Sequence, residues 1–310
     1  MREFRTHITC EEIGLFAHFN KIVYICERIH ITYPFANEYI MKKSEQISYN
    51  YLRRYIDSIR SVGRYSFTLE ELQNEFNISY GALKQNLYRL KSKNEIAQVR
   101  QGFYVTIPPE YSKQGMLPPY LFIDDLMKSL NKPYYVALLS AAALHGAAHQ
   151  QPMEFFVIVR TPAPRSINNK KLKISFFSKN NWGQDDIVQK ATNAGYINIS
   201  SPELTALDIL NYPQKIGLNR ATTVLQELAP IMKISALVKT ALRYQSTPVI
   251  QRLGYILDKI LGEEKLAESL QKALNRRSSI PVLLSTQNEN KGVTDETWKV
   301  IKNVEIESDL

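Results

Sequence analysis

The pattern of apolar and polar positions becomes regular at Tyr49. A first helix is predicted before Gly63 by apolar residues at helical spacing, which are Leu52, Tyr55, Ile56 and Ile59. A second helix is predicted to begin after Thr68, because Glu71 follows it by three positions and the two residues can form a capping box. Its apolar stripe consists of Leu69, Leu72 and Phe76.

A third helix and a hairpin are predicted to follow. The segment Asn77-Ile78-Ser79 makes a tight connection, and Ser79 is the expected N-cap of the third helix. Its buried face is predicted to consist of Leu83, Leu87 and Leu90. Strands over Glu95–Val99 and Phe103–Ile107 are then joined by a turn in which Gly102 can adopt a positive φ. Three helices and a hairpin within about sixty residues are the order of a winged helix-turn-helix.

The remainder of the chain mixes helices and strands. Strands are predicted over Phe155–Arg160, Leu172–Phe177, Gly195–Ile199 and Trp298–Ile306. Helices are predicted over Tyr134–Gly146, Glu203–Leu210, Lys215–Ala229, Ser235–Gln245, Pro248–Leu261 and Glu263–Leu274, with Ser201 as the cap of the second and Pro202 at its first position. The predicted fold class is therefore α+β: an N-terminal winged helix-turn-helix and a larger mixed α/β C-terminal domain with a helical part.

Three segments follow from this pattern. Residues 1–48 are an extension whose structure the pattern does not define, and Tyr33-Pro34 interrupts it. Residues 49–112 are the predicted winged helix-turn-helix domain. Residues 113–310 are the C-terminal domain, because Pro108-Pro109 and the segment Ser112–Pro119 indicate a linker or boundary.

The amino-acid composition indicates which kinds of binding partner and which cellular compartment to expect. The chain of 310 residues has 39 basic and 30 acidic residues, a formal charge of +9, which favours a polyanionic partner unless the charge serves only solubility. Its 2 cysteines form no disulfide framework and fit no zinc site, so a reducing cytoplasm is expected. The N-terminus lacks the pattern of a signal peptide, and the longest apolar stretch, Tyr134–Ala148, is too short and too interrupted to span a membrane.

The predicted third helix carries its charge on the side opposite the leucines. Between Glu75 and Glu95 no acidic residue occurs, whereas basic and aromatic residues recur on the outward stripe. Reading of the major groove needs such a helix, with polar side chains for base edges and cations for phosphates. The predicted DNA-binding residues are Ser79, Tyr80, Lys84, Gln85, Tyr88, Arg89, Lys91, Lys93, Arg100 and Gln101. The alternative is a protein-interaction module whose tyrosines pack against another domain.

A second basic run follows in the C-terminal part. No acidic residue lies between Glu154 and Asp185, and the run consists of Arg160, Arg165, Lys170, Lys171, Lys173 and Lys179. On strands and their connecting loop these residues could extend a nucleic-acid surface. A solvated hairpin explains them as well.

The sequence contains no motif that clearly indicates an enzyme. His145 and His149 have metal-ligand spacing, but HGAAH lacks the glutamate that a zinc hydrolase needs after its first histidine. The pairs Asp124-Asp125 and Asp185-Asp186 each fit a helix start, and no glycine-rich phosphate loop or nucleophile elbow is present. We therefore expect a protein that is not an enzyme and has no cofactor and no metal.

Four separated segments together resemble one family, the AbiEi antitoxins of type IV toxin-antitoxin systems, over about Tyr49 to Leu310. They are Arg100–Val105 (RQGFYV), Tyr135–Gly146 (YVALLSAAALHG), Ser201–Leu210 (SPELTALDIL) and Trp298–Asp309 (WKVIKNVEIESD). Each segment alone is weak, but their order and spacing are specific. Residues 1–48 have no counterpart in this pattern.

The resemblance implies both a fold and a function. It implies a winged helix joined to a larger C-terminal domain that carries the antitoxic activity. It also implies repression of the protein's own operon through inverted repeats in the promoter. The sequence does not define the oligomeric state, and a monomer in solution that binds DNA cooperatively is one arrangement that fits. The implied counterpart is a nucleotidyltransferase-type toxin, which is opposed without a stable complex. The alternative is a toxin-neutralising interaction module whose winged helix does not read DNA.

The resemblance carries few individual residues over. The helix Ser79–Lys93 and the tip Arg100-Gln101 match the family's DNA-reading element. The segments around His145, Glu203 and Asp208 resemble structural signatures, a close helix end and a capped helix start. We therefore predict a structural role, and not a catalytic one, for these three residues.

Overall fold

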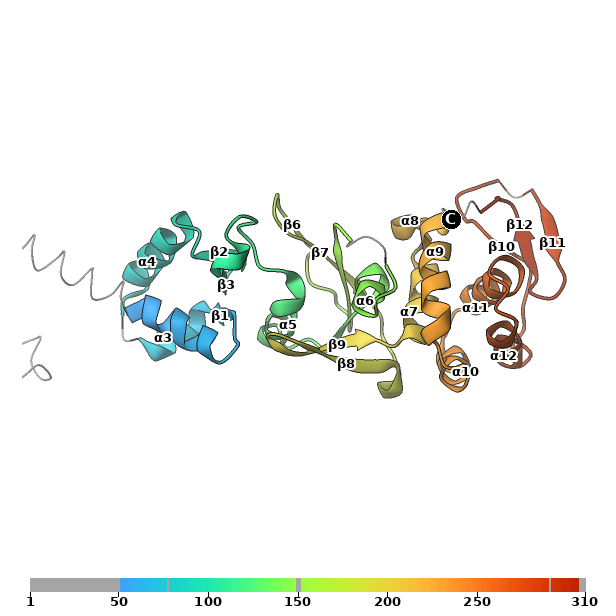
Figure 1. Ribbon diagram of the computed structural model, residues 1–310, viewed down its shortest axis with the longest axis horizontal. Coiled ribbons are helices and arrows are strands. Elements are labelled where there is room, and N and C mark those ends of the chain that lie inside the picture. Colours follow the sequence, from blue (N-terminus) through green and yellow to red (C-terminus); the bar gives the residue numbers. More distant parts are fainter. Residues whose placement is uncertain (1–50, 77, 149–151, 290, 307–310) are drawn as a thin grey trace, which may run out of the picture. The chain divides into compact units, whose positions relative to one another are not determined.

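The computed structural model of the chain describes residues 51–76, 78–148, 152–289 and 291–306 (Figure 1). The predicted extension 1–48, Asn77 and His149 lie outside the described residues. Residues 55–310 form one compact unit, and residues 51–54, the described part of the other unit, are helical. As predicted, the described chain is a mixture of helices and several sheets.

The first elements follow the predicted order. A helix runs over residues 51–61 and is followed by Gly63 with a φ of 76°. The next elements are β1 (Ser66–Thr68), α3 (Leu69–Glu75), α4 (Tyr80–Ser92), β2 (Ile96–Arg100) and β3 (Phe103–Thr106). Thr68 and Glu71 form the predicted capping box at the start of α3. The strand β1 was not predicted, and it pairs with β3 to give a three-stranded sheet of order β1-β3-β2.

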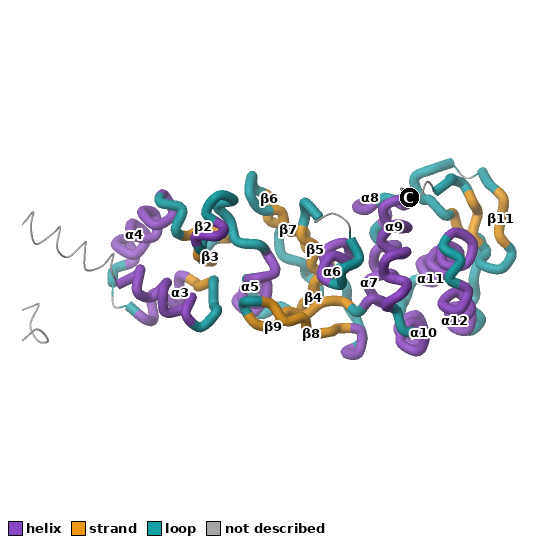
Figure 2. Tube along the Cα trace, viewed as in Figure 1, coloured by secondary structure: helices purple, strands orange, loops and turns teal. Residues whose placement is uncertain are grey.

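A six-stranded sheet of order β6-β7-β5-β4-β9-β8 forms the middle of the described chain, with its strands in orange in Figure 2. Its strands are β4 (Tyr134–Val136), β5 (Phe155–Val159), β6 (Ile167–Asn168), β7 (Lys173–Ser178), β8 (Ile187–Thr192) and β9 (Gly195–Ser200). The predicted strands correspond to β5, β7 and β9, whereas β6 and β8 were missed. The sheet is mixed, because β4 pairs antiparallel with β5 and parallel with β9.

The prediction of one helix over Tyr134–Gly146 was wrong. The segment begins with strand β4, and only Leu138–Leu144 is helical (α6). The aromatic and β-branched side chains of Tyr134, Tyr135 and Val136 favour a strand, and all three are buried. A local apolar run does not distinguish a buried strand from a buried helix, and here the pairing with β5 and β9 decides.

The segment predicted as a linker or boundary packs into a core. It contains the short 3-10 turns η1 (Pro109–Tyr111) and η2 (Pro119–Leu121) and leads into α5 (Ile123–Ser129). Met116 and Leu117 are buried in the same apolar cluster as Val105 from β3 and Val157 from β5. Because β2, β3 and the six-stranded sheet share this cluster, removal of residues 1–112 would expose apolar surface.

Helices dominate the chain after β9. They are α7 (Pro202–Asn211), α8 (Pro213–Ile216), α9 (Leu218–Leu228), α10 (Ile234–Arg243), α11 (Thr247–Tyr255) and α12 (Glu264–Leu274), with a 3-10 turn η4 (Ala229–Ile231) and a π-helical turn η5 (Ile256–Ile260). The predicted helix Lys215–Ala229 is interrupted, because Gly217 adopts a φ of 78° between α8 and α9. None of the helices in the described ranges is long and apolar enough to span a bilayer.

A small sheet closes the described chain, with β10 (Val282–Leu283), β11 (Val293–Asp295) and β12 (Val300–Lys302) in the order β10-β12-β11. The predicted strand Trp298–Ile306 is therefore shorter than expected. Trp298 itself is fully buried against Gly254 of α11, where an added Cβ would lie 1.9 Å from the indole ring. The indole Nε1 donates to Asp258 Oδ2 at 2.9 Å, so this tryptophan fastens the small sheet to the helices.

Candidate functional site

Helix α4 has one buried face and one exposed face. Leu83, Leu87 and Leu90 are buried as predicted, and Asn86 is buried with them. On the opposite side, Tyr80 and Tyr88 are 54% and 67% exposed. Lys84, Gln85 and Lys91 are also exposed. The helix therefore presents large aromatic and cationic side chains to solvent, where burial of apolar surface cannot explain them.

The two ends of α4 are fixed by local chemistry. The Ser79 hydroxyl accepts a hydrogen bond from the Ala82 amide at 3.4 Å, and no acidic residue lies in the first turn. Arg89 and Lys91 lie in the last turn, where cations stabilise the negative end of the helix dipole. This structural role applies to both residues whether or not they bind a ligand. Asn94 then adopts a φ of 55° and leads the chain into β2.

The hairpin that follows α4 ends in an exposed turn. Residues Gln101 and Gly102 form it, and Gly102 has the positive φ expected, 76°. Gln101 is exposed. Arg100 is half-buried in β2, opposite Phe103, and its Nη1 is enclosed without a hydrogen-bond partner. Of the two predicted tip residues, Gln101 is therefore accessible to a ligand. The side chain of Arg100 is partly enclosed by the protein.

The second basic run does not form one surface. Lys173 forms an ion pair with Glu154 at 3.2 Å, and the Arg160 guanidinium lies 5.4 Å from the centroid of the Trp182 ring. Lys179 turns inward to a buried carboxylate described below. Arg165 and Lys170 are exposed. The run therefore divides between cations engaged with neighbouring side chains and cations that face solvent.

Two residues of that run lie beside the end of α4. A cavity of about 420 Å³ is lined by Lys91 and Asn94 at the end of α4 and by Lys170 and Lys171 before β7. No acidic residue is among the described residues that line it. The loop is held in place because the Asn169 side chain accepts from the backbone amides of Lys171 and Leu172 at 3.0 and 2.8 Å. Two basic segments far apart in the sequence thus share one concave surface.

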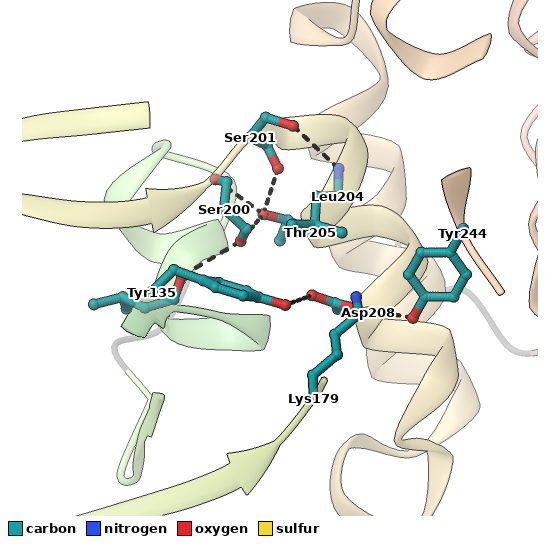
Figure 3. Close-up of polar contacts among 9 residues, drawn as sticks. Tyr135, Lys179, Ser200, Ser201, Leu204, Thr205, Asp208 and Tyr244 are labelled. Carbon is teal, nitrogen blue, oxygen red and sulfur yellow. Dashed lines mark hydrogen bonds and ion pairs between the residues drawn. The ribbon is translucent and has the colours of Figure 1, made fainter. Parts of the chain in front are cut away.

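A buried carboxylate connects four elements of the C-terminal part (Figure 3). Asp208 of α7 is fully buried. Its Oδ2 accepts from the Tyr135 hydroxyl of β4 at 2.9 Å. Its Oδ1 accepts from the Tyr244 hydroxyl at the end of α10 and from Lys179 Nζ after β7, both at 2.9 Å. Lys179 Nζ also lies 4.4 Å from the centroid of the Tyr244 ring.

The electrostatics of this cluster favour protonated phenols. Burial, and then the charge of Asp208, raise the pKa of Tyr135 and of Tyr244 well above the usual value. Both hydroxyls therefore remain donors to the carboxylate. Three donors therefore surround the buried carboxylate of Asp208. The arrangement links β4, α7, α10 and the segment after β7, and the sequence alone could not identify the partners of Asp208.

The start of α7 is also fixed by side chains. Ser201 Oγ accepts from the Leu204 amide at 3.2 Å, which confirms the predicted cap. The hydroxyls of Ser200 and Thr205 are 2.6 Å apart (Figure 3). Glu203 is buried, and its Oε1 accepts from the Lys233 amide at 2.7 Å. Glu203 thus links the start of α7 to the residue before α10.

His145 has a structural contact as well. Its Nε2 lies 2.7 Å from the Ser200 carbonyl oxygen, and burial lowers its pKa below the usual value. Within the described ranges no group of three or more His, Cys, Asp or Glu side chains could hold a metal ion. Asp124 and Asp125 lie in the first turn of α5, and Asp185 and Asp186 in a 3-10 turn, as the sequence predicted.

Part of the C-terminal region matches a known protein family. Residues 135–259 match the family model of the AbiEi antitoxin C-terminal domain. This match confirms the resemblance to AbiEi antitoxins and covers β4, α6, Asp208 and the helices through α11. Among curated protein sequences, no significant match was found.

Solved structures also align with the chain, to different extents. The crystal structure of the RV2827C protein from Mycobacterium tuberculosis aligns with a TM-score of 0.57 at 18% identity, over 81% of this chain and 91% of that one. This likeness indicates a shared fold. An antigenic nucleotidyltransferase-like protein from Paracoccidioides brasiliensis aligns over 48% of this chain and 88% of that one, at 12% identity. Its TM-score is 0.30, which does not establish a shared fold.

Proposed function

We propose that this protein, which carries an AbiEi antitoxin C-terminal domain over residues 135–259, is a bifunctional antitoxin that also binds DNA and represses its own operon. The domain match supports the antitoxin role. The finer parts of the proposal are the DNA reading by α4, the inverted repeats in the promoter, and a nucleotidyltransferase-type toxin opposed without a stable complex. The protein is proposed to act in the cytoplasm and to need no cofactor.

One observation carries the DNA-binding part. The solvent face of α4 presents Tyr80, Lys84, Gln85, Tyr88 and Lys91, while its leucines face the core. A helix of 13 residues held at its N-terminus by Ser79 is long enough to lie in a major groove. In this proposal α3 and α4 are the helix-turn-helix, and β2 and β3 are the wing.

The roles of individual side chains follow from their positions along α4. Lys84 and Gln85 lie in its N-terminal half, where recognition helices contact base edges. Lys91 lies at the C-terminal end, beside Lys170 across the cavity of about 420 Å³. We assign these two lysines to phosphates, which fix register and strengthen binding without reading sequence. The C-terminal domain therefore contributes to the proposed DNA surface.

A second candidate function rests on the two tyrosines. Exposed aromatic residues are enriched at the centres of protein interfaces, so Tyr80 and Tyr88 could also bind a protein partner. In that case α4 would be an adaptor, and the basic residues would be its solvated rim.

A promoter reporter and a growth assay in the same cells separate the two functions. The promoter upstream of the gene drives the reporter, and the full-length protein is co-expressed with the adjacent toxin. The proposal predicts that wild type represses the reporter and restores growth, while Gln85→Ala with Lys84→Ala relieves repression and still restores growth. Loss of growth rescue with intact repression would instead favour the adaptor function.

A further inference from the structure

A second cavity lies in the antitoxin domain, away from the residues assigned to DNA. It has a volume of about 390 Å³ and lies at the junction between the end of α7 and the start of α8. Its lining is completed by Ser246 before α11, Val249 and Arg252 of α11, Phe177 of β7 and Thr286 after β10. Cavities of this size are typical of sites for small organic ligands.

The charge of the lining has one sign. Arg252 and Lys215 are its two charged residues, and no Asp or Glu is among the described residues that line it. Arg252 is held in place because its Nε donates to the Leu283 carbonyl oxygen at 2.8 Å. Burial lowers the pKa of Arg252, and no carboxylate opposes that effect. A half-buried cation without a counter-charge is costly, and a bound anion would compensate it.

Another arginine of the same domain shows the usual arrangement. Arg243 of α10 forms an ion pair with Asp186 Oδ1 at 2.6 Å and lies 3.7 Å from Asp185 Oδ2. Within the described ranges, Arg252 has no such ion pair. Arg243 is thus paired with carboxylates, whereas Arg252 lines a cavity without a carboxylate partner among the described residues.

The remaining lining is suited to a flat ring. Phe177 and Tyr212 form an aromatic pair with their ring centroids 4.7 Å apart. Ser246 is the N-cap residue of α11 and makes no capping hydrogen bond through its side chain, so its hydroxyl can donate to a ligand. Aromatic walls, a few neutral donors and a cationic end are the features of a site for an aromatic anion.

We propose that this cavity binds a small organic anion, with its aromatic ring against Phe177 and Tyr212 and its phosphate or carboxylate group at Arg252 and Lys215. The site does not depend on the proposed DNA binding, because none of its lining residues belongs to that surface. It does lie close to the buried carboxylate. Leu210 and Asn211 follow Asp208 on α7, and Phe177 precedes Lys179 by two residues.

Four probes test the ligand chemistry by calorimetric titration of the full-length protein. Phenyl phosphate and benzoate combine the ring with either anionic group, inorganic phosphate lacks the ring, and phenol lacks the charge. We expect one of the first two to bind more tightly than inorganic phosphate and phenol, and the tighter one identifies the anionic group. Absence of binding by both aromatic anions at millimolar concentration would overturn the proposal.

Matched variants test the place of binding. Lys215 is exposed, so Lys215→Ala should fold normally and weaken the better probe by about tenfold, as expected for loss of a charge-assisted contact. Arg252→Gln should weaken it further. Lys239→Ala, an exposed lysine of α10 outside the cavity, should bind like wild type. Should Arg252→Gln fail to fold, Lys215→Ala and Lys215→Glu decide, and unchanged affinity in both would refute the site.

Discussion

The ammonium group of Lys179 lies 2.9 Å from Oδ1 of Asp208, 29 residues further along the chain and fully buried. The pair joins the segment after β7 to the middle of α7. Lys179 belongs to a basic run that the sequence would place on a surface, yet its side chain is only 22% exposed. Lys179 therefore supplies the positive charge that compensates the buried carboxylate of Asp208.

Loss of Lys179 should destabilise the protein strongly. Lys179→Met keeps most of the side-chain volume but leaves Asp208 buried without its cation, which costs about 3–5 kcal/mol. Lys173→Met is the matched control, because Lys173 is itself exposed and its partner Glu154 keeps the hydrogen bond from Ser175, so the expected loss is smaller, about 1 kcal/mol. Urea unfolding of both variants measures the difference. Equal free energies of unfolding would show that the buried pair contributes no more than the surface pair.

The two phenols of the cluster give stability a specific pH dependence. Their pKa is raised in the folded protein, so above the unfolded value near 10 the unfolded chain loses protons that the folded protein keeps. Stability is therefore fully present below pH 10 and declines above it, by about 1.4 kcal/mol per pH unit for each phenol.

Tyr135→Phe removes one of the two phenols. The decline in stability above pH 10 should therefore be less steep in this variant, by about 1.4 kcal/mol per pH unit. Urea unfolding at intervals from pH 8 to pH 11.5 measures it, and below pH 10 the difference between variant and wild type should stay constant. Parallel curves above pH 10 would contradict the burial of a protonated Tyr135 beside Asp208.

His145 should make the protein less stable as the pH falls, whereas the two phenols make it less stable as the pH rises. Burial lowers its pKa in the folded protein, so below the unfolded value near 6.5 the unfolded chain binds a proton that the folded protein refuses. Wild type should therefore lose more stability than His145→Gln between pH 7.5 and pH 5, by at most about 1.4 kcal/mol per pH unit. Thermal or urea unfolding at these pH values measures it, and identical losses would contradict the inferred role of His145.

The sequence predicts the part of the fold that local signals determine. Ser79 caps α4, Gly102 turns the hairpin, and the leucine spacing defines the buried face, because each of these signals acts within a few residues. Strand β4 depends instead on Val136 pairing with Val157 and Ile199, which lie far away in the sequence. A helix was therefore predicted where a strand forms.

The candidate sites follow the same division. The exposed stripe of α4 could be predicted from periodicity, because solvent exposure of a helix face follows from its buried face. The partners of the second basic run could not be predicted from the sequence. Lys173 and Lys179 find Glu154 and Asp208 only in three dimensions, and Lys170 lies beside Lys91 only because the loop before β7 reaches the end of α4.

Lys170 should contribute to DNA binding, and Lys173 should not. If a phosphate is bound at the cavity beside Lys91, Lys170→Ala should weaken binding to every DNA sequence and reduce the slope of log K against log salt by about 0.9. Lys173→Ala removes a cation already paired with Glu154, so its slope should match wild type. Anisotropy titrations at several salt concentrations measure both, and equal slopes in the two variants would exclude the C-terminal contribution.

The reading of DNA by α4 is tested most directly by titrating the promoter fragment and a scrambled duplex with Gln85→Ala, Lys91→Ala and the control Lys239→Ala at several salt concentrations. Gln85→Ala should cost about 1–3 kcal/mol on the promoter and little on the scrambled duplex, because it removes a base contact. Lys91→Ala should weaken both and reduce the salt slope by about 0.9, because it removes a phosphate contact. Binding of Gln85→Ala and Lys91→Ala that equals that of Lys239→Ala on both duplexes would contradict the account.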